Sequence, residues 1–461
     1  MPPILALLLW LILLLALFWY DPAKSPGMSA LWVPTIWLFI IGSKLPSQWL
    51  GGGYESAAQA LQEGNPLDRS IDLVLIVLAT GILISRSFDW ARFLRCNFIL
   101  MVLLMFALVS VLWSDFPFVA FKRWFRDLGN YLMILVVLSD PRPLEAVGTL
   151  LRRLSYLLLP LCILLIKYYP NIGVQYDYWT GAKMFVGATT AKNLLGVLCL
   201  IGGLFFFWDT VTRWSTRKDK RTKRILKVNF AFMWMTLWLL NDADSATSRV
   251  CLAIGCLIIL AAQSKFTERH PGVLKTLIPV CFCLYLILAY GFDINGQLAG
   301  AVGRDATLTG RTVIWDAVLR THTNPIVGAG YETFWLGPRL EAVWELAGHV
   351  TEAHNGYLEL YLHLGLIGVF LFCAFLIASY RSICRKFKPF SNFASLSLAL
   401  WTINLLYNMT EAAAFKGQLM WIIFLLGAIV VPAKPNVGDA PLVKASSFEE
   451  SPTTLREVVT A

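Results

Sequence analysis

Apolar runs long enough to cross a lipid bilayer dominate this sequence. A helix needs about 20 apolar residues to cross the hydrocarbon core, and runs near that length recur from Pro2 to beyond Trp421. Hydrophobic residues make up 57% of the 461 positions and charged residues only 15%, which excludes an ordinary soluble domain. A membrane β-barrel would show short alternating strands instead. The sequence therefore predicts an all-α, polytopic transmembrane helical bundle.

The apolar runs divide into about twelve or thirteen expected spans within a membrane domain, residues 1–433. The first run, PPILALLLWLILLLALFWY, lacks the basic start and the cleavage site of a signal peptide, so we expect a retained helix. The polar tail 434–461, rich in Pro, Ser and Thr, is expected to be disordered in the cytoplasm. The expected spans are 2–19, 28–42, 71–86, 97–113, 127–139, 153–169, 193–210, 229–240, 250–263, 276–291, 356–379, 392–409 and 416–432.

The distribution of Lys and Arg predicts the topology. The formal net charge is +10, but in a membrane protein basic residues set orientation, and we expect no nucleic-acid partner. The stretch Arg213–Lys227, RWSTRKDKRTKRILK, holds eight basic residues in fifteen and should be cytoplasmic. Counting apolar runs outward puts the other short basic loops on the same side: Arg86/Arg92/Arg95, Arg142/Arg152/Arg153, Lys265/Arg269/Lys275 and Arg381/Arg385/Lys386/Lys388.

The segment 292–355 is then a long external loop between two membrane helices. Loops of this length without a function are uncommon. It contains the helix-like stretches RTVIWDAVLR and LEAVWELAG and a turn at NPIVGAGY. We expect it to form a partly ordered cap over the mouth of the bundle.

The nine cysteines are scattered through apolar segments. They form no CxxC pair, and only Cys281 and Cys283 lie close together in the sequence. This pattern is not that of a disulfide scaffold or a zinc site. We expect neither a metal nor a cofactor.

Basic residues on the predicted external side are the first candidate site residues. An ionised side chain at membrane depth is costly, so it marks a site or a counter-charge. One interpretation is that these residues reach lipid phosphates. The other is that they bind a diphosphate, because the guanidinium fork matches phosphate oxygens bidentately. The candidates are Lys192, Arg249, Arg304, Arg311 and, in the amphipathic stretch DFPFVAFKRWFRDLG, Arg123 and Arg126.

For Arg249, a local salt bridge with Asp242 or Asp244 is an alternative explanation. Arg304 and Arg311 each follow a glycine, which lets the backbone approach an anion closely.

His354 lies where the external loop meets an apolar helix, in TEAHNGYLELYLHLGLIG. Asn355 is suited to cap that helix. A neutral imidazole, with a pKa of about 6.5, is the usual side chain for taking a hydroxyl proton at physiological pH. From the residues alone, a structural role and a general-base role both stay open for His354. The other four histidines have simpler structural interpretations.

Five motifs occur in order along the second half of the chain: GATTAKN, SATSR, GRDATLTGRTVIW, NPIVGAGYETFW and HNGYLELYLHLGLIG. Together they resemble the O-antigen ligase/polymerase superfamily, by motif from about 187 to 368 and by hydropathy over the whole chain. The earlier stretch EGNPLDRSID, residues 63–72, is similar to the exopolysaccharide-polymerase branch. The resemblance implies a GT-C-like fold in the bacterial inner membrane, with the active site on the periplasmic face.

The resemblance also implies an activity: metal-independent, inverting transfer of a glycan from an undecaprenyl diphosphate carrier to an acceptor hydroxyl. The family's essential histidine matches His354, its loop arginine Arg311 and the arginine of its SR motif Arg249. The family often has a second acidic residue near His363, so His363 stays unassigned. The remaining matched or supporting residues are Lys192, Asn193, Trp315, Tyr331, Asn355 and Glu359. The implied partners are the lipid-linked donor, a lipid-linked or glycolipid acceptor and membrane lipids, with a chain-length regulator as a further candidate.

Alternatives remain within and outside this class. A ligase and a polymerase use the same donor and differ in the acceptor, and EGNPLDR slightly favours a polymerase. A secondary transporter or a flippase for lipid-linked glycans is a rival from another class. Transporters show two related halves and broken helices at corresponding positions, and the sequence shows neither. A noncatalytic assembly subunit is a third alternative.

Overall fold

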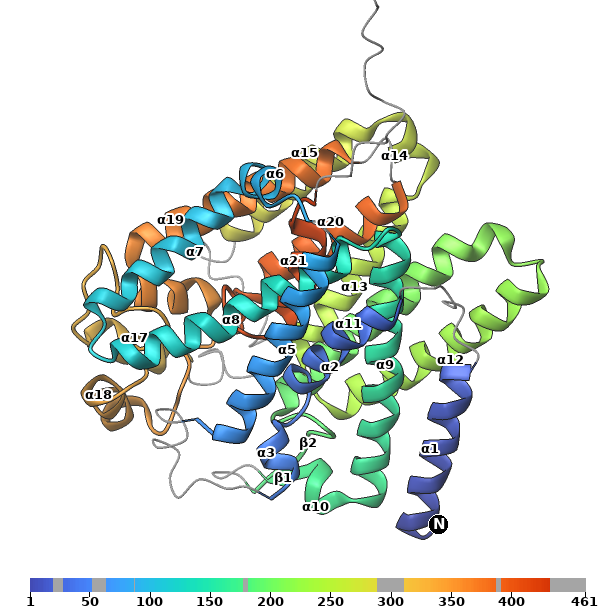
Figure 1. Cartoon of the computed structure of the whole chain (residues 1–461), viewed down its shortest axis with the longest axis horizontal. Coiled ribbons are helices and arrows are strands. Elements are labelled where there is room, and N and C mark those ends of the chain that lie inside the picture. Colours follow the sequence, from blue (N-terminus) through green and yellow to red (C-terminus); the bar gives the residue numbers. More distant parts are fainter. Residues whose placement is uncertain are drawn as a thin grey trace, which may run out of the picture. The chain divides into compact units, whose positions relative to one another are not determined.

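The computed structural model describes residues 1–19, 28–51, 64–86, 88–176, 181–287, 311–386 and 391–431, all within one unit, Met1–Val431 (Figure 1). Part of the external loop, 292–310 with Arg304, lies outside the described residues, as does the predicted tail 434–461. Their expected roles therefore stay predictions.

The described part of the chain is helical except for one short hairpin. The hairpin pairs β1 with β2 in antiparallel register, with Val174 opposite Phe185. The elements are α1 (Pro3–Trp19), η1 (Met28–Leu31), α2 (Trp32–Ile41), α3 (Pro46–Trp49), α5 (Pro66–Ser85), α6 (Trp90–Cys96), α7 (Phe98–Val109), η2 (Ser110–Trp113), α8 (Pro117–Leu138), α9 (Pro143–Tyr168), α10 (Pro170–Gly173), β1 (Val174–Tyr176), β2 (Lys183–Phe185), α11 (Lys192–Arg213), η3 (Trp214–Thr216), α12 (Lys220–Asp242), α13 (Ala246–Ala262), α14 (Lys265–Arg269), α15 (Pro271–Leu286), α17 (Arg311–Arg320), α18 (Pro338–Ala347), α19 (Gly356–Arg385), α20 (Ser391–Tyr407) and α21 (Leu419–Ala428).

The prediction of an all-α membrane protein is confirmed. Each expected span overlaps a helix in the described residues, and the spans expected at 127–139, 153–169 and 229–240 belong to the longer helices α8, α9 and α12. Three helices are long and apolar enough to cross a membrane: α9, α19, and α11 together with its extension to Thr216. Helices α5 and α6 would form a fourth span if they are counted as one bent pair. Other apolar helices in the described residues are shorter. The number of crossings and the GT-C likeness stay predictions.

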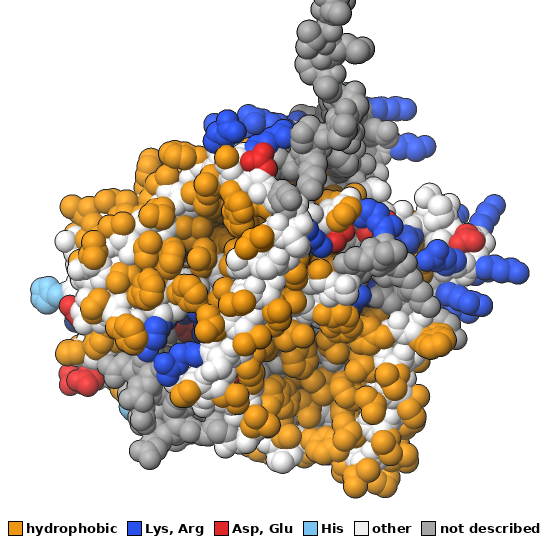
Figure 2. All heavy atoms as spheres, viewed as in Figure 1, with side chains coloured by type: hydrophobic (Ala, Val, Ile, Leu, Met, Phe, Trp, Pro, Cys, Tyr) orange, Lys and Arg blue, Asp and Glu red, His pale blue; other side chains and the backbone are white. Residues whose placement is uncertain are grey.

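Helix α11 forms the centre of the packing, against α9, α12 and α13. Its Phe205 and Phe206 are fully buried, and Gly255 of α13 lies so close to Ile403 of α20 that a Cβ there would be 2.5 Å from Ile403 Cδ1. Close van der Waals fit is what holds helices together where lipid is as apolar as the side chains. By contrast, α1 buries only Ala6 and presents apolar side chains outward. Figure 2 shows the broad hydrophobic surface that this arrangement leaves for lipid.

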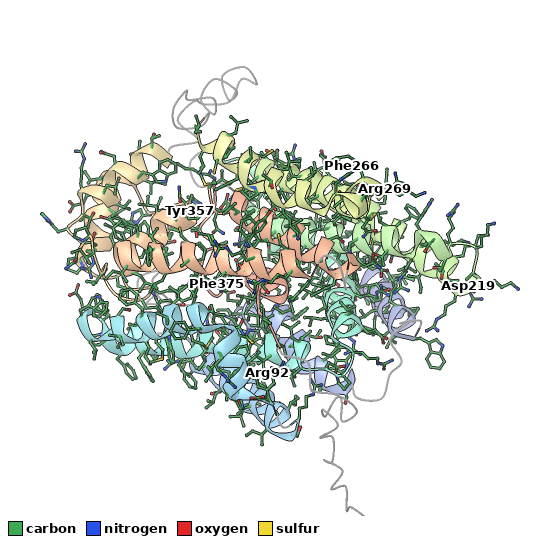
Figure 3. The ribbon with its side chains drawn as sticks, turned by 90° about the horizontal axis from the view of Figure 1, so that it is seen from above. Arg92, Asp219, Phe266, Arg269, Tyr357 and Phe375 are labelled. Atoms are coloured by element: carbon green, nitrogen blue, oxygen red, sulfur yellow. The ribbon has the colours of Figure 1, made fainter. Side chains whose placement is uncertain are left out.

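Helices α19, α20 and α21 form a second packed group. Phe375 of α19 lies edge-on against Trp421 and Phe424 of α21, at 6.1 Å between ring centroids (Figure 3). Helix α20 packs against α13 and α21. The connection from α20 to α21 is therefore held next to the start of α19, where His354 lies.

Several residues of the predicted basic loops lie in helices, among them Arg92 in α6, Lys265 in α14 and Arg152 in α9. Arg152 lies within α9, 3% exposed, and its Nη2 is 2.8 Å from Asp209 Oδ2 of α11. Asp209 also pairs with Arg213 at 2.8 Å and accepts a hydrogen bond from Asn229 at 2.9 Å. The prediction of Arg152 as a loop residue was wrong because its charge is compensated inside the bundle.

Helix α19 is broken at Gly365, which has a φ of 62°. The external segment 325–330 crosses the break and supplies the missing hydrogen bonds. The N–H groups of Ala329 and Gly330 donate to the carbonyls of Leu362 and His363 at 2.9 and 3.0 Å, and two N–H groups after the break donate back to the segment. A break in a membrane helix is tolerated only when its freed backbone groups find such partners. The crossing fixes the external loop onto the helix that follows His354.

Gly328→Ala is expected to destabilise the protein much more than Gly348→Ala. Both glycines have positive φ, 71° and 77°, so alanine costs roughly 1–2 kcal/mol at either position. A Cβ at position 328 would also lie 2.5 Å from the carbonyl oxygen of His363, whereas nothing lies within 4 Å at position 348. Thermal unfolding of the detergent-solubilised variants, followed by tryptophan fluorescence, measures the difference. Equal losses of Tm would contradict the close crossing.

Candidate functional site

His354 occupies the turn directly before α19 with a left-handed backbone, at a φ of 50°. Such a conformation is uncommon for a residue other than glycine and depends on its surroundings. The preceding Ala353 is fixed on both sides: Trp315 Nε1 donates to its carbonyl at 2.8 Å, and its N–H donates to Glu359 Oε1 at 2.6 Å. Trp315 and Glu359 thus position the backbone of His354.

Glu359 is itself held by buried partners on α19 and in the external loop. Trp335 Nε1 donates to its Oε2 at 3.0 Å, and His363 Nε2 lies 3.1 Å from the same oxygen. Both Glu359 and His363 are less than 10% exposed. His363, unassigned by the sequence, therefore supports Glu359 and does not face His354 directly.

Asn355 caps α19, as the sequence predicted. Its Oδ1 accepts hydrogen bonds from the N–H groups of Tyr357 and Leu358, each at 3.1 Å. The next residue, Gly356, donates its N–H to the carbonyl of Asn408 at 2.9 Å. This bond ties the start of α19 to the connection between α20 and α21.

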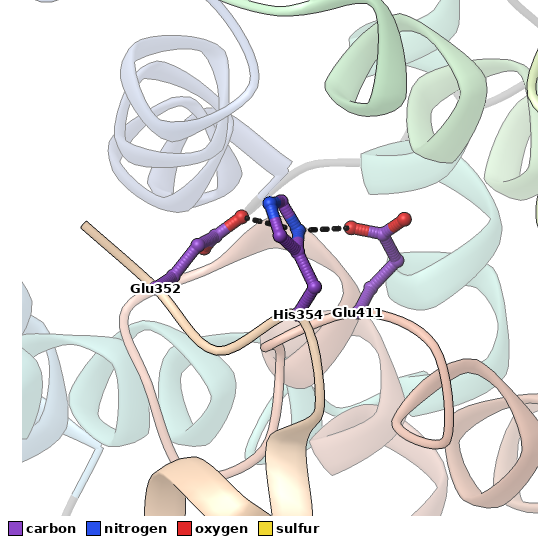
Figure 4. Close-up of side chains that lie close together, drawn as sticks. All are labelled: Glu352, His354 and Glu411. Carbon is purple, nitrogen blue, oxygen red and sulfur yellow. Dashed lines mark ion pairs between the residues drawn. The ribbon is translucent and has the colours of Figure 1, made fainter. Parts of the chain in front are cut away.

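That connection brings Glu411 to His354. The imidazole Nδ1 lies 3.1 Å from Glu352 Oε1 on one side and 3.5 Å from Glu411 Oε2 on the other (Figure 4). Within the described residues, Nδ1 has no hydrogen bond of good geometry. The two carboxylates therefore lie where they can pair with the ring once it is protonated.

Glu411 joins three residues that the sequence singled out separately. Its Oε1 pairs with Arg311 Nη2 at 3.1 Å and accepts a hydrogen bond from Asn193 Nδ2 at 3.0 Å. The side chains of Glu411 and Arg311 are only 9% and 16% exposed. Arg311 begins α17 and Asn193 lies in the first turn of α11. One carboxylate thus gathers an arginine, an amide and the histidine from three distant parts of the chain.

Lys416 is a second cation at the site. Its Nζ lies 3.9 Å from Glu352 Oε2. Burial lowers the pKa of Lys416, but the carboxylates of Glu359 and Glu352 outweigh this effect and hold it above its ordinary value. Lys416 therefore stays charged and partly neutralises the acidic residues around His354.

The surroundings raise the pKa of His354. Burial by itself lowers it, since the charged ring is poorly solvated, but the carboxylates of Glu411 and Glu352 favour the charged ring more strongly. Burial also raises the pKa of Glu352, against the opposing charges of Lys416 and His354. The site is built to accept a proton on His354 and to stabilise the resulting imidazolium.

Residues 228–373 match the family described as O-Antigen ligase. The chain is also 25% identical over 298 residues to the exopolysaccharide production protein ExoQ of Rhizobium meliloti (strain 1021). Part of the chain is therefore similar to the O-Antigen ligase family, and a larger part to an exopolysaccharide production protein. The aligned part covers 60% of this chain and 62% of ExoQ, so the chain spans less than two thirds of that relative's length.

The part of the chain that matches the O-Antigen ligase family contains His354, Arg311 and Arg249. Asn193, Glu411 and Lys416 lie outside it. The cluster around His354 thus includes side chains from both sides of the matched region, and Glu411 contacts Arg311 inside that region and Asn193 outside it.

Arg249 is not among the residues that contact Glu411. It forms an ion pair with Asp244 at the exposed surface, which is the salt bridge that the sequence left as an alternative. Its segment nevertheless borders the site, because Thr247 Oγ1 is 2.9 Å from the hydroxyl of Thr410, the residue before Glu411. Lys192 precedes Asn193 in the first turn of α11, partly exposed. Diphosphate binding by either residue stays a prediction.

Arg123 and Arg126 belong to a neighbouring cluster on α8. Arg123 donates to the carbonyl of Glu332, and Arg126 lies 3.9 Å from Asp127 with its side chain 49% exposed. Tyr331, in the GAGY motif, donates its hydroxyl to Asp127 Oδ2 at 2.8 Å. Tyr331 is thus a structural partner of α8.

The cluster on α8 also adjoins Lys416. A Cβ added at Gly417 would lie 3.0 Å from Arg126 Nη2, which places the Arg126 guanidinium beside the residue that follows Lys416. Arg126 therefore lies near Lys416 in the fold, while Arg311 lies beside Glu411.

Sequence reasoning missed Glu411 and Lys416. Both lie in TEAAAFKGQ, the interruption between the last two apolar helices. Glu411 does not stand out because the positive-inside rule concerns basic residues, and Lys416 falls at the start of the expected span 416–432. The signal for Glu411 was its position at the predicted external end of a membrane helix. A buried or membrane-edge carboxylate is as costly as a basic side chain there, so it also indicates a functional or structural partner.

Glu352, His354 and Glu411 also have the ligand types and spacing of a metal site, with their donor atoms within 4.8 Å of one another. Two cations already lie against these carboxylates, Arg311 on Glu411 and Lys416 beside Glu352. This positive charge disfavours a divalent ion at the same place. The structure therefore gives a physical reason to expect chemistry without a metal.

Glu352→Gln is expected to lower the pKa of His354, because it removes one of the two opposite charges beside the ring. Histidine ¹³Cε1 NMR of the labelled protein in nanodiscs measures the titration. Asp316→Asn is the matched control, since this exposed carboxylate pairs with Arg320 and should leave the pKa of His354 unchanged. An unchanged or raised pKa in the Glu352 variant would contradict the ion-pair assignment.

Proposed function

We propose that this chain is a membrane glycosyltransferase. It transfers a glycan from an undecaprenyl-diphosphate-linked donor to an acceptor hydroxyl, on the periplasmic face of the bacterial inner membrane. The observation that carries the proposal is the joining of His354 and Arg311 through one buried carboxylate, Glu411. The similarity to the O-Antigen ligase family and to an exopolysaccharide production protein supports the substrate class.

In the proposed reaction, the acceptor hydroxyl oxygen attacks the anomeric carbon of the donor sugar. The bond from that carbon to the diphosphate oxygen breaks, and the diphosphate leaves with the electron pair. The hydroxyl proton goes to His354, the general base. Attack opposite the leaving group inverts the anomeric configuration. Glu411 and Glu352 stabilise the imidazolium, in keeping with the raised pKa of His354.

Arginine and lysine side chains supply the positive charge that the leaving diphosphate needs, without a metal. Preorganised cations in a poorly solvated site are an effective way to stabilise developing negative charge. We assign this role to Arg311 and Arg126, with Lys416 beside them. Of the two guanidinium groups, that of Arg126 is the more exposed. Contributions from Arg123, Arg249, Lys192 and Arg304 are part of the same hypothesis.

The acceptor is proposed to be a second lipid-linked glycan, which makes the enzyme a polymerase. The name of the relative, an exopolysaccharide production protein, agrees with the EGNPLDRSID resemblance on this point. A ligase would transfer the same donor glycan to a different glycolipid. Purified protein supplied with only the lipid-linked donor distinguishes them, because a polymerase then makes longer lipid-linked glycans and a ligase does not.

The break in α19 bears on the rival function of transport. The sequence showed no broken helix, and the structure has one at Gly365. Transporters use such breaks to bind substrate or ions at the bilayer midplane. Here the freed backbone groups bond to the segment 325–330, so they are not available to a transported ligand. The break is a structural device that anchors the external loop.

His354→Asn is expected to reduce transfer by about 10²–10⁴-fold, the usual cost of removing a general base. Asparagine tolerates the left-handed backbone at this position, so the fold should be kept. The assay is polymer formation from purified lipid-linked donor. His349→Asn is the control, because it changes an exposed histidine of the same loop and should leave the rate unchanged. Normal product length with the His354 variant would contradict the assignment of His354 as the general base.

Arg311→Lys is expected to lower turnover by about 10²-fold or more, because a single ammonium group does not replace the bidentate guanidinium. The matched control is Arg320→Lys at the other end of α17, where the side chain is 68% exposed and pairs with Asp316. Turnover is measured on the same purified donor. Near-native turnover of the Arg311 variant would count against a diphosphate contact.

A further inference from the structure

A cavity of about 370 Å³ lies beside the crossing of segment 325–330 with α19. Its floor is the buried backbone of Gly328 and Ala329, and its rim carries the exposed side chains of His322 and Asn324. The volume is in the range of small-molecule sites. None of the candidate site residues in the described part of the chain lines it. The cavity is therefore distinct from the His354 site.

Both hydrogen-bond donors and hydrogen-bond acceptors surround this cavity. Arg339 pairs with Asp115, while its Nε, among the described residues, has no hydrogen-bond partner. Asn324 uses its Oδ1 to accept from the N–H groups of Ile326 and Val327 at 2.9 and 3.4 Å, which leaves its amide N–H groups to point elsewhere. The lining thus offers several donors and acceptors around an arginine that is already neutralised.

One wall of the cavity is aromatic. The indole of Trp113 is fixed by a hydrogen bond from its Nε1 to the carbonyl of Val327 at 3.3 Å and by packing against Phe106 at 5.8 Å between centroids. An aromatic ring beside planar polar side chains matches a hexopyranose, which has an apolar C–H face and hydroxyl groups that both donate and accept. Arg339 is paired with Asp115, and the Asp115 carboxylate can accept hydrogen bonds from sugar hydroxyls.

We propose that this cavity is a glycan subsite that binds hexopyranose residues of the acceptor glycan, away from the hydroxyl that reacts. The proposal rests on the proposed function. Ala329, which lines the cavity, donates to the carbonyl of Leu362 in α19, and the next residue, Gly330, donates to that of His363. The same helix begins at the Asn355 cap next to His354. A glycan held here is fixed relative to the general base through α19.

The test is direct binding, measured apart from transfer. The probe is the repeat-unit oligosaccharide released by mild acid from the lipid-linked donor of the producing cells and freed of lipid and phosphate. Saturation-transfer NMR and a fluorescence titration with the full-length protein in nanodiscs measure its affinity. His322→Ala and Asp115→Asn change exposed cavity residues. His349→Ala, on the same loop but outside the cavity lining, is the control.

Both cavity variants should weaken binding about tenfold or more, while the control binds like the unchanged protein. In the transfer assay the KM for the acceptor should rise, with little change in kcat, and products should be shorter. Unchanged binding by His322→Ala overturns the subsite, as does displacement of the probe by inorganic phosphate. Binding that depends on these residues, in a protein without transferase activity, would uphold the subsite while removing the proposed reaction.

Discussion

The site depends on the interactions made by the carboxylate of Glu411. It pairs with Arg311 from the external loop, accepts a hydrogen bond from Asn193 at the start of α11 and lies beside His354. A charge held at the edge of a membrane must be compensated, and Glu411 and Arg311 compensate each other. The same carboxylate raises the pKa of His354. A structural ion pair and the readiness of His354 to take a proton therefore have one origin.

A second constraint, the break in α19, fixes the position of the external loop. The break at Gly365 frees backbone groups of α19, and in a membrane these groups must be bonded within the protein. The segment 325–330 satisfies them, which is why an irregular loop is held firmly against a membrane helix. Through α19 and the buried Glu359, this crossing is linked to Ala353 and so to the strained backbone of His354.

Local signals allowed much of the fold to be predicted. Apolar runs located the helices but not all of their ends: α8, α9 and α12 begin at Pro117, Pro143 and Lys220, well before the expected 127, 153 and 229, because charged residues near their starts interrupt the apolar runs. Asn355 could be recognised as a cap because capping acts over a few neighbouring residues. Glu411 and Lys416 were missed because their roles arise only when the connection before α21 packs beside α19. Arg152 was misplaced for a related reason: its partner Asp209 lies on another helix. Long-range ion pairs leave no periodic trace in the sequence.

The anomeric configuration of the newly formed linkage tests the proposed mechanism most directly. Purified protein, a lipid-linked donor of known anomeric configuration and a metal chelator would be combined, and the product linkage determined by NMR. Base catalysis by His354 with guanidinium stabilisation of the diphosphate predicts an inverted linkage, formed at an undiminished rate in the presence of the chelator. A retained configuration, or a reaction that needs an added divalent cation, would contradict it.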